Sequence, residues 1–140
     1  MSLNANDIEV GSTFSAVVVE DLKRTQIVQY AGTSGDYNPL HTDEIFATQV
    51  AGYPTVFAHG MLTMGMTGRM LTDLVGNGRL TEFGGRFSSQ VFPGDDLTAT
   101  AVVEAIEEQG DDLVAAFAVT TTNQDDVTVF SGHARARIDR

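Results

Sequence analysis

A carboxylate and an imidazole stand five positions apart in a segment of turn-forming residues, SGDYNPLH, at positions 34–41. A nearly extended backbone would keep Asp36 and His41 too far apart to share a ligand, but the turn at Asn38 and Pro39 can fold them towards one point. An ionised carboxylate and a neutral imidazole can then both accept from one water, which orients it and raises its nucleophilicity. The residues alone leave an alternative open, in which Asp36 caps a turn and His41 lies on the surface.

A second candidate group lies at His59 and Gly60, where a long apolar run begins. The first amides of a helix have no intrahelical partner and carry positive dipole character, so they suit a developing oxyanion. Gly60 has no side chain and would let a substrate carbonyl come close. The alternatives are that Gly60 only begins a helix beneath a crowded sheet and that His59 is a hydrogen-bonded structural histidine.

Other chemistries are disfavoured by what the chain lacks. It has no cysteine, which excludes disulfides, thiolate metal sites and a cysteine nucleophile. Its three histidines include no close pair, so no metal site is expected. The sequence also has no serine-hydrolase elbow, phosphate-binding loop or dinucleotide fingerprint.

The chain of 140 residues is strongly acidic, with a formal net charge of -11. Such a field repels nucleic acid and anionic membrane, so we expect neither as a partner. Binding of an anionic ligand would need a local group of basic residues at the entrance to its site. The candidates for it are Arg86 and the pair Arg135 and Arg137, which share an outward face with His133.

The N-terminal residues lack the pattern of an export signal, and the longest apolar run, 61–75, carries Arg69 and Asp73. This run is too short and too charged to span a bilayer. We therefore expect a cytoplasmic protein.

Local patterns predict the elements of the first half: a strand at 13–19, a helix over 21–31 that the segment 32–38 ends, a short helix from Asp43 and a long helix over 59–75. The long helix is apolar on nearly every face, which predicts that a sheet wraps it. Gly65 and Gly68 would let that sheet approach closely.

The second half of the chain alternates with the two-residue period of strands. The predicted inner faces consist of Phe83, Phe87 and Val91; of Leu97, Ala99, Ala101, Val103 and Ala105; of Leu113, Ala115, Phe117 and Val119; and of Phe130, Ala134, Ala136 and Ile138. Turn sequences at 93–96, 109–112 and 123–126 are expected to join neighbouring antiparallel strands. The sequence thus predicts one α+β domain over residues 1–140, with a curled antiparallel sheet around a buried helix.

The segment 30–41 resembles the hydratase-2 motif of MaoC-like (R)-specific enoyl-CoA hydratases, through its Asp-x-Asn-Pro-x-His core at 36–41. The resemblance extends from about residue 25 to the end and includes AHGM at 58–61, GRF at 85–87 and FPGD at 92–95. Within this family, the run 58–66 is most similar to the catalytic B subunit of type II fatty-acid-synthase (3R)-hydroxyacyl-ACP dehydratases. Lys23 departs from the pattern, since relatives often carry a Ser or Thr cap before the first helix.

This resemblance implies a hot-dog fold and the reversible hydration of trans-2-enoyl thioesters, of coenzyme A or acyl carrier protein, to (3R)-hydroxyacyl thioesters. It implies that Asp36 and His41 bind the water, which adds to C3 and delivers a proton to C2. The Gly60 N–H would bind the thioester oxygen and Asn38 would hold the turn, while His59 joins the three arginines as a candidate substrate-binding residue.

The resemblance further implies that no metal or organic cofactor is required. It implies that two hot-dog folds pair edge to edge, as a homodimer or as a heterodimer with a hot-dog paralogue, with the acyl tunnel at their interface. Two other functions stay open: an acyl-thioester hydrolase and a non-catalytic acyl-binding partner subunit. Both are disfavoured because Asp36 and His41 are intact in their Asn-Pro setting.

Overall fold

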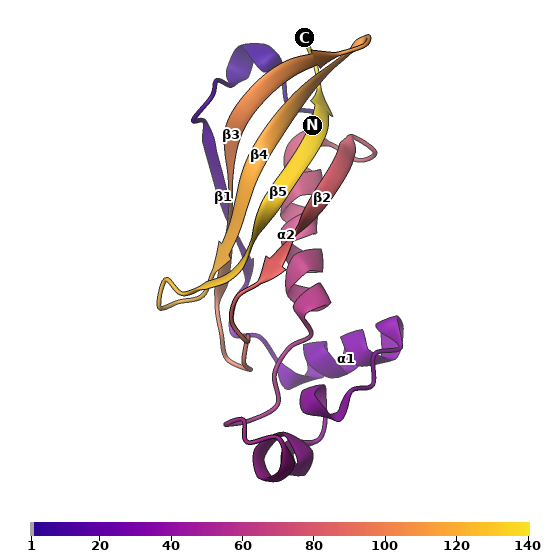
Figure 1. The fold of residues 1–140 in the computed structure, drawn as a ribbon, viewed down its shortest axis with the longest axis vertical. Helices are drawn as coiled ribbons and strands as arrows, with labels where there is room; N and C mark the ends of the chain where they lie inside the picture. Colours follow the sequence, from indigo (N-terminus) through magenta and orange to yellow (C-terminus); the bar gives the residue numbers. More distant parts are fainter. Residues whose placement is uncertain (1) are drawn as a thin grey trace.

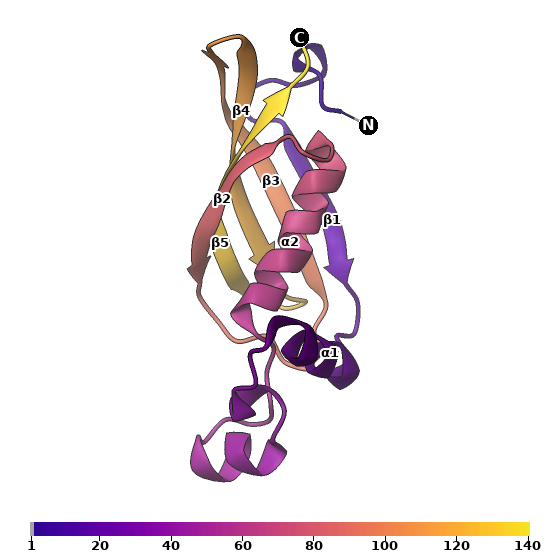
Figure 2. The same ribbon diagram turned by 90° about the vertical axis from the view of Figure 1, so that its right-hand side faces the viewer.

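A five-stranded antiparallel sheet curls around one long helix in the computed structural model, which describes residues 2–140 (Figures 1 and 2). The strands are β1 (Thr13–Val19), β2 (Leu80–Phe87), β3 (Leu97–Gln109), β4 (Asp112–Thr122) and β5 (Thr128–Ile138), in the order β1-β3-β4-β5-β2. The helices are α1 (Arg24–Ser34), the long α2 (Gly60–Val75), the 3-10 turns η1 (Ala5–Asp7) and η2 (Pro39–His41), and the π-helical η3 (Phe46–Val50). This architecture confirms the predicted α+β layout.

The core lies between α2 and the concave face of the sheet. Leu71 and Val75 of α2 are fully buried and belong to one apolar cluster with Phe117 of β4 and Phe130 of β5. The predicted inner faces of β4 and β5 are confirmed, because these strands bury alternate residues as expected. Apolar burial stabilises by roughly 25 cal/mol per Å². The same packing holds the C-terminal half of α2 against the sheet.

Strand β3 departs from the predicted alternation near its end. The register with β4 shifts between Val103 and Ala105, which marks a β-bulge. After the bulge, Ile106 packs against the core and Ala105 is only partly buried, so the prediction of an inward Ala105 is wrong. A bulge inserts one extra residue and moves the following side chains to the other face.

One predicted connection is also wrong. The turns at 109–112 and 123–126 do join neighbouring strands, but 93–96 leads from β2 to β3, which lie apart in the sheet. This turn is held instead by the segment after β1, since Leu22 N donates to Asp95 O at 3.0 Å and Gly94 N donates to Leu22 O at 2.8 Å. The composition of a turn predicts that the chain reverses its direction, but it does not predict which strands pair.

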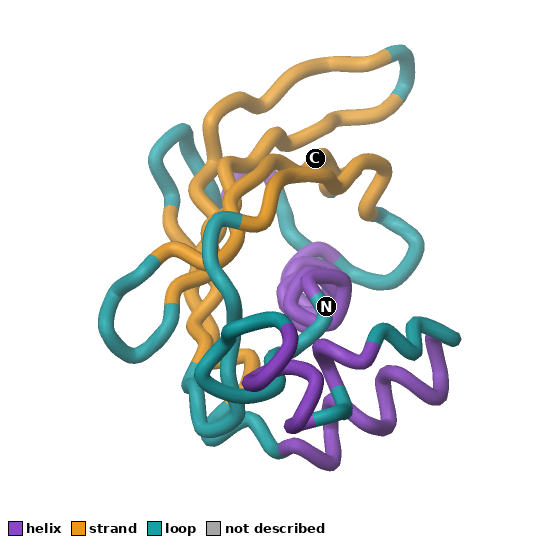
Figure 3. The backbone as a smooth tube through the Cα atoms, turned by 60° about the horizontal axis from the view of Figure 1, so that its bottom comes forward, coloured by secondary structure: helices purple, strands orange, loops and turns teal. Residues whose placement is uncertain are grey.

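Helix α1 lies three residues later than the predicted 21–31, because Asp21 has a left-handed φ of 48° and the helix starts only at Arg24. The Gln26 side chain accepts from Lys23 N at 2.8 Å and so caps the start without a Ser or Thr. Gly35, with φ 76°, ends the helix immediately before Asp36. The helical segments from α1 to η3 gather at one end of the sheet, beside the start of α2 (Figures 2 and 3).

The sheet covers only part of α2, which corrects the prediction of a helix wrapped on every side. Met61 is 55% exposed, and Gly65 has nothing near the position of a Cβ atom. Gly68 does lie against the sheet, since a Cβ there would be 3.1 Å from the Phe83 ring. Among residues 2–140, no helix has the length and apolar character needed to cross a membrane.

Candidate active site

The turn between α1 and α2 places Asp36 and His41 on the same side of a short helical turn. Asn38 caps this turn, because its Oδ1 accepts from Leu40 N at 3.0 Å. The Asp36 Oδ1 accepts from Asn38 N at 3.2 Å, which tightens the backbone between the pair. Asp36 is exposed whereas His41 is buried, so the carboxylate faces solvent and the imidazole forms the floor of the site.

The protonation of His41 follows from its backbone partner. Its Nδ1 lies 2.6 Å from the carbonyl oxygen of Phe57, and a carbonyl can only accept. The proton of the neutral ring is therefore on Nδ1, which leaves the lone pair on Nε2. The ring is thereby held as a hydrogen-bond acceptor, and Phe57 is a contributor that the sequence did not reveal.

His59 supports both members of the pair. Its side chain is 2% exposed, its Nε2 donates to the backbone carbonyl of Asp36 at 3.0 Å, and its ring stacks on His41 with centroids 3.8 Å apart. The edge of Tyr30 packs on the other side, at 4.8 Å between centroids. The geometry matches the hydrogen-bonded structural histidine that the sequence left open, and it brings His59 directly to the site.

Burial is the main cause that lowers the pKa of His41 below its ordinary value of about 6.5. The hydrogen bond to Phe57 opposes this effect, the neighbouring His59 adds to it, and the Asp36 carboxylate opposes it weakly. His41 is therefore neutral at neutral pH, which is the state that a water-activating base requires.

One water can bridge Asp36 and His41. A carboxylate oxygen of Asp36 and one ring nitrogen each of His41 and His59 lie within 4.8 Å of one another. Two acceptors no more than 4.8 Å apart, each at about 2.8 Å from a shared water oxygen, subtend at most about 118°. Both acceptors are thus within reach of one water molecule, which the pair can hold and polarise.

The same trio of side chains has the composition of a metal site, but not its geometry. A zinc ion needs both imidazole lone pairs to converge at about 2.0–2.1 Å. The rings of His41 and His59 are stacked, with centroids 3.8 Å apart and only 23° between their planes, so their in-plane lone pairs lie in two separate, nearly parallel planes and do not converge on one ion. The His59 Nδ1 is buried and has no hydrogen-bond partner among the described residues. This arrangement does not fit a tetrahedral ion.

Gly60 is the first residue of α2 and lies beside this pair, after His59. Outside the regular helices and strands, none of the hydrogen bonds of residues 2–140 uses the Gly60 amide. A cavity of about 240 Å³ opens here, lined by Gly60, Thr63, Phe57 and the segment that follows β2. A larger cavity of about 830 Å³ lies between β1 and α2 and includes none of Asp36, His41 and Gly60. Of these two cavities, the smaller one reaches Gly60, whereas Asp36 and His41 line neither of them.

The structure separates the three candidate arginines. Arg86 is exposed at the end of β2 that lies beside the start of α2 (Figure 2). Arg135 pairs with Glu107 at 2.9 Å, and Arg137 donates to the carbonyl of Gly78 at 2.8 Å, beyond the opposite end of α2. Of the three candidates, Arg86 is thus the one at the end of the sheet that carries the site.

Comparisons with known proteins agree with this fold. The chain matches the sequence profile of the MaoC like domain over residues 5–126. It is 35% identical over 102 residues to an (R)-specific enoyl-CoA hydratase of Rhodospirillum rubrum, covering 71% of this chain and 69% of that protein. It superposes with a TM-score of 0.82 and 26% identity on an (R)-hydratase from A. caviae involved in PHA biosynthesis, covering 96% of this chain and 99% of that one.

The architecture is thus the hot-dog fold that the resemblance implied. The chain belongs to the MaoC-like family. It is also 47% identical over 68 residues to 3-hydroxyacyl-thioester dehydratase Y of Mycobacterium tuberculosis, covering 46% of this chain but only 23% of that protein. The chain spans less than a third of other curated relatives too, an enoyl-CoA hydratase of the same organism among them.

Proposed function

We propose that this chain is an enoyl-thioester hydratase and dehydratase, which interconverts trans-2-enoyl and (3R)-hydroxyacyl thioesters of coenzyme A or acyl carrier protein. The observation that carries the proposal is the convergence of the Asp36 carboxylate and the neutral His41 ring beside the amide of Gly60, which has no hydrogen-bond acceptor among residues 2–140. The names of the relatives, a hydratase and a dehydratase, support the same reaction.

The reaction follows from these groups. The Asp36 carboxylate and His41 Nε2 hold the water, and His41 accepts one of its protons as the oxygen forms a bond to C3. The electron pair of the C2–C3 double bond moves towards the thioester, whose oxygen gains negative charge and accepts a hydrogen bond from Gly60 N–H. A proton from the pair is then delivered to C2, and the reverse sequence eliminates water.

Crotonyl-CoA distinguishes this reaction from the two alternatives. A hydratase lowers the absorbance of the conjugated alkene without releasing thiol, whereas an acyl-thioester hydrolase releases free coenzyme A. A non-catalytic acyl-binding subunit changes neither signal. Thiol release without loss of the alkene would replace the proposed function with hydrolysis.

We also infer that a second hot-dog fold, a copy of this chain or a paralogue, covers the free edge of β2. This strand lies at the edge of the sheet, and its last residue, Phe87, is 49% exposed beside the cavity. Unpaired strand edges and exposed aromatic side chains favour association. The mass of the purified chain in solution tests the pairing. A cytoplasmic location stays a prediction.

The pH dependence of the reaction should follow His41. Because burial lowers its pKa below 6.5, the ring stays neutral into mild acid. The acid limb of kcat/KM should therefore lie below pH 6.5, since this parameter reports the free enzyme. The same shift removes folding stability as pH falls from 6.5 towards the pKa in the folded state, because the unfolded chain then binds more protons.

The kinetic limb can be compared with an NMR titration of His41. The exposed His133, which pairs with Glu82 at 2.8 Å on the outer face of the sheet, provides the control. His133→Gln should leave the limb in place. A limb above pH 6.5 that shifts in His133→Gln would contradict the assignment to His41.

The position of Arg86 predicts an effect on substrate binding. Arg86→Gln should raise KM for crotonyl-CoA and flatten its dependence on ionic strength, with kcat nearly unchanged, because it removes positive charge at this end of an acidic chain. The double variant Arg135→Gln/Arg137→Gln is the matched comparison. If the double variant flattens the salt dependence of KM and Arg86→Gln does not, the coenzyme A part of the substrate binds at the opposite end of the sheet or on the partner subunit.

A further inference from the structure

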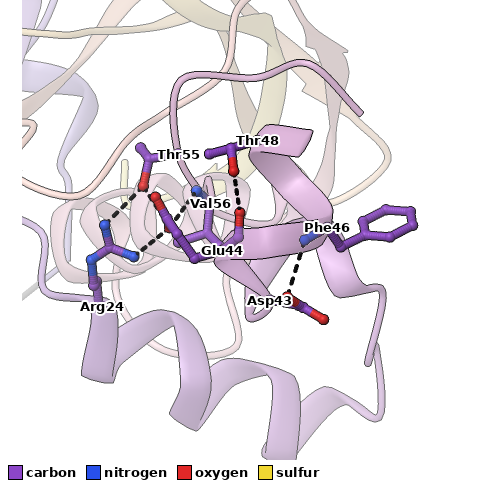
Figure 4. Close-up of polar contacts among 7 residues, drawn as sticks. All are labelled: Arg24, Asp43, Glu44, Phe46, Thr48, Thr55 and Val56. Atoms are coloured by element: carbon purple, nitrogen blue, oxygen red, sulfur yellow. Dashed lines mark hydrogen bonds and ion pairs between the residues drawn. The ribbon is translucent and has the colours of Figure 1, made fainter. Parts of the chain in front are cut away.

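One exposed carboxylate ties together three segments that meet at the candidate site. The Glu44 Oε2 accepts from Arg24 Nη1 at 2.8 Å, from Thr55 Oγ1 at 2.9 Å and from Val56 N at 3.3 Å (Figure 4). Arg24 also donates from Nη2 to Thr55 Oγ1 at 2.8 Å, so the three side chains form a closed ring of hydrogen bonds. We name Arg24, Glu44 and Thr55 the polar clamp.

Each segment held by the clamp leads directly to a group of the site. Arg24 begins α1, whose other end passes through its cap to Asp36. Glu44 follows His41 by three residues, in a turn that Asp43 caps by accepting from the amide of Phe46 at 3.0 Å. The clamp therefore ties the start of α1, the helix that leads to Asp36, to the segment in which the chain leaves the turn.

The third segment makes the link to the imidazole. Val56, which donates to Glu44, is followed by Phe57, whose carbonyl accepts the Nδ1 proton of His41 at 2.6 Å. The amide of Phe57 also donates to the carbonyl of Leu40 at 3.3 Å, so this segment and the turn run side by side. Only one peptide unit separates the carboxylate of the clamp from the acceptor that sets the His41 tautomer.

The energetics of the clamp favour a role in positioning over one in stability. The side chains of Arg24 and Glu44 are 54% and 48% exposed, and ion pairs this exposed add little to the free energy of unfolding. Hydrogen bonds from Arg24 and then Thr55 lower the pKa of Glu44, which keeps its carboxylate charged. A catalytic base, in contrast, is sensitive to displacements below 1 Å.

We propose that Glu44 and Arg24 are positioning residues for His41. They hold the segment 55–57, and through the Phe57 carbonyl they fix the tautomer and the direction of the imidazole. The kinetic consequence of this proposal rests on the proposed function, but the structural consequence does not.

Nitrogen NMR of the histidine rings tests the structural consequence without any substrate. In the wild-type chain, the His41 signals, assigned by their absence from His41→Gln, should show a fixed proton on Nδ1. In Glu44→Ala they should move towards a mixture of tautomers. The control is Glu108→Ala, which removes a more exposed ion pair, Arg140–Glu108 at 3.0 Å, away from the site. An unchanged His41 signal in Glu44→Ala would overturn the proposal.

The kinetic test uses the same variants with crotonyl-CoA. Glu44→Ala and Arg24→Ala should each lower kcat about tenfold with KM nearly unchanged, and the double variant should be little worse than either. Glu44→Gln keeps an acceptor for Thr55 and Val56 and should recover most of the rate, which also protects the test against poor folding of Glu44→Ala. A loss equal to that of Glu108→Ala would contradict positioning. If the wild-type chain itself is inactive, the proposed function fails while the NMR result still decides the role of the clamp.

Discussion

Replacing Asp36 by Asn, or His41 by Gln, should lower kcat for hydration of crotonyl-CoA about 10²–10⁴-fold. Each replacement keeps the approximate size of the side chain but substitutes a neutral amide for one of the two basic acceptors that are proposed to bridge the water. Asp36→Asn loses the negative charge, and His41→Gln loses the lone pair that the Phe57 contact leaves on Nε2. The measurement is the initial rate of alkene loss, with circular dichroism to confirm that the fold is retained.

The double variant separates a joint role from two independent ones. Residues that act on one water as a unit are non-additive, so Asp36→Asn/His41→Gln should be little slower than the slower single variant. If the two residues acted independently, the fold-losses in kcat of the two single variants would multiply in the double variant. Near-normal turnover in Asp36→Asn would remove the basis for the proposed reaction, because the carboxylate is one of the two acceptors that are proposed to hold the water.

The fold was predictable where local patterns determine it and not where distant segments compete. The alternation in β4 and β5 and the length of α2 follow directly from apolar periodicity. The strand order was not predictable, because a turn such as 93–96 has the same composition whether it joins neighbours or crosses the sheet. The bulge after Val103 leaves no mark in the apolar pattern of β3, since Ala105 and Ile106 are both apolar.

For the candidate site, the sequence identified the side chains but not the backbone that holds them. Asp36 and His41 lie together, as their spacing indicated, and His59, which Gly60 follows, joins them, as the family resemblance implied. The Phe57 carbonyl, which sets the His41 tautomer, could not be found because every residue has a carbonyl and this one is 16 positions away. The position of Arg135 and Arg137 could not be inferred either, since an outward face gives no information about which end of a sheet a residue occupies.

A side chain at Gly60 should lower kcat about 10²–10³-fold, the range expected for the loss of one oxyanion donor. The variant Gly60→Val places its branched side chain beside the amide that is proposed to bind the thioester oxygen. It also meets the Phe87 ring, because a Cβ on Gly60 would lie 2.8 Å from that ring. Phe87 is 49% exposed, so its ring can turn outwards and the fold should be retained.

Two further variants separate a blocked amide from a displaced Phe87. The first is Gly65→Val, which makes the same change on the same helix where a Cβ meets nothing within 4 Å, and it should keep the rate within a small factor of the wild type. The second is Phe87→Ala, alone and combined with Gly60→Val. If the amide is the oxyanion donor, Phe87→Ala alone should be mildly affected and the combination as slow as Gly60→Val. Recovery of the rate in the combination would show that crowding against Phe87 caused the loss, and the oxyanion role of Gly60 would then have to be abandoned.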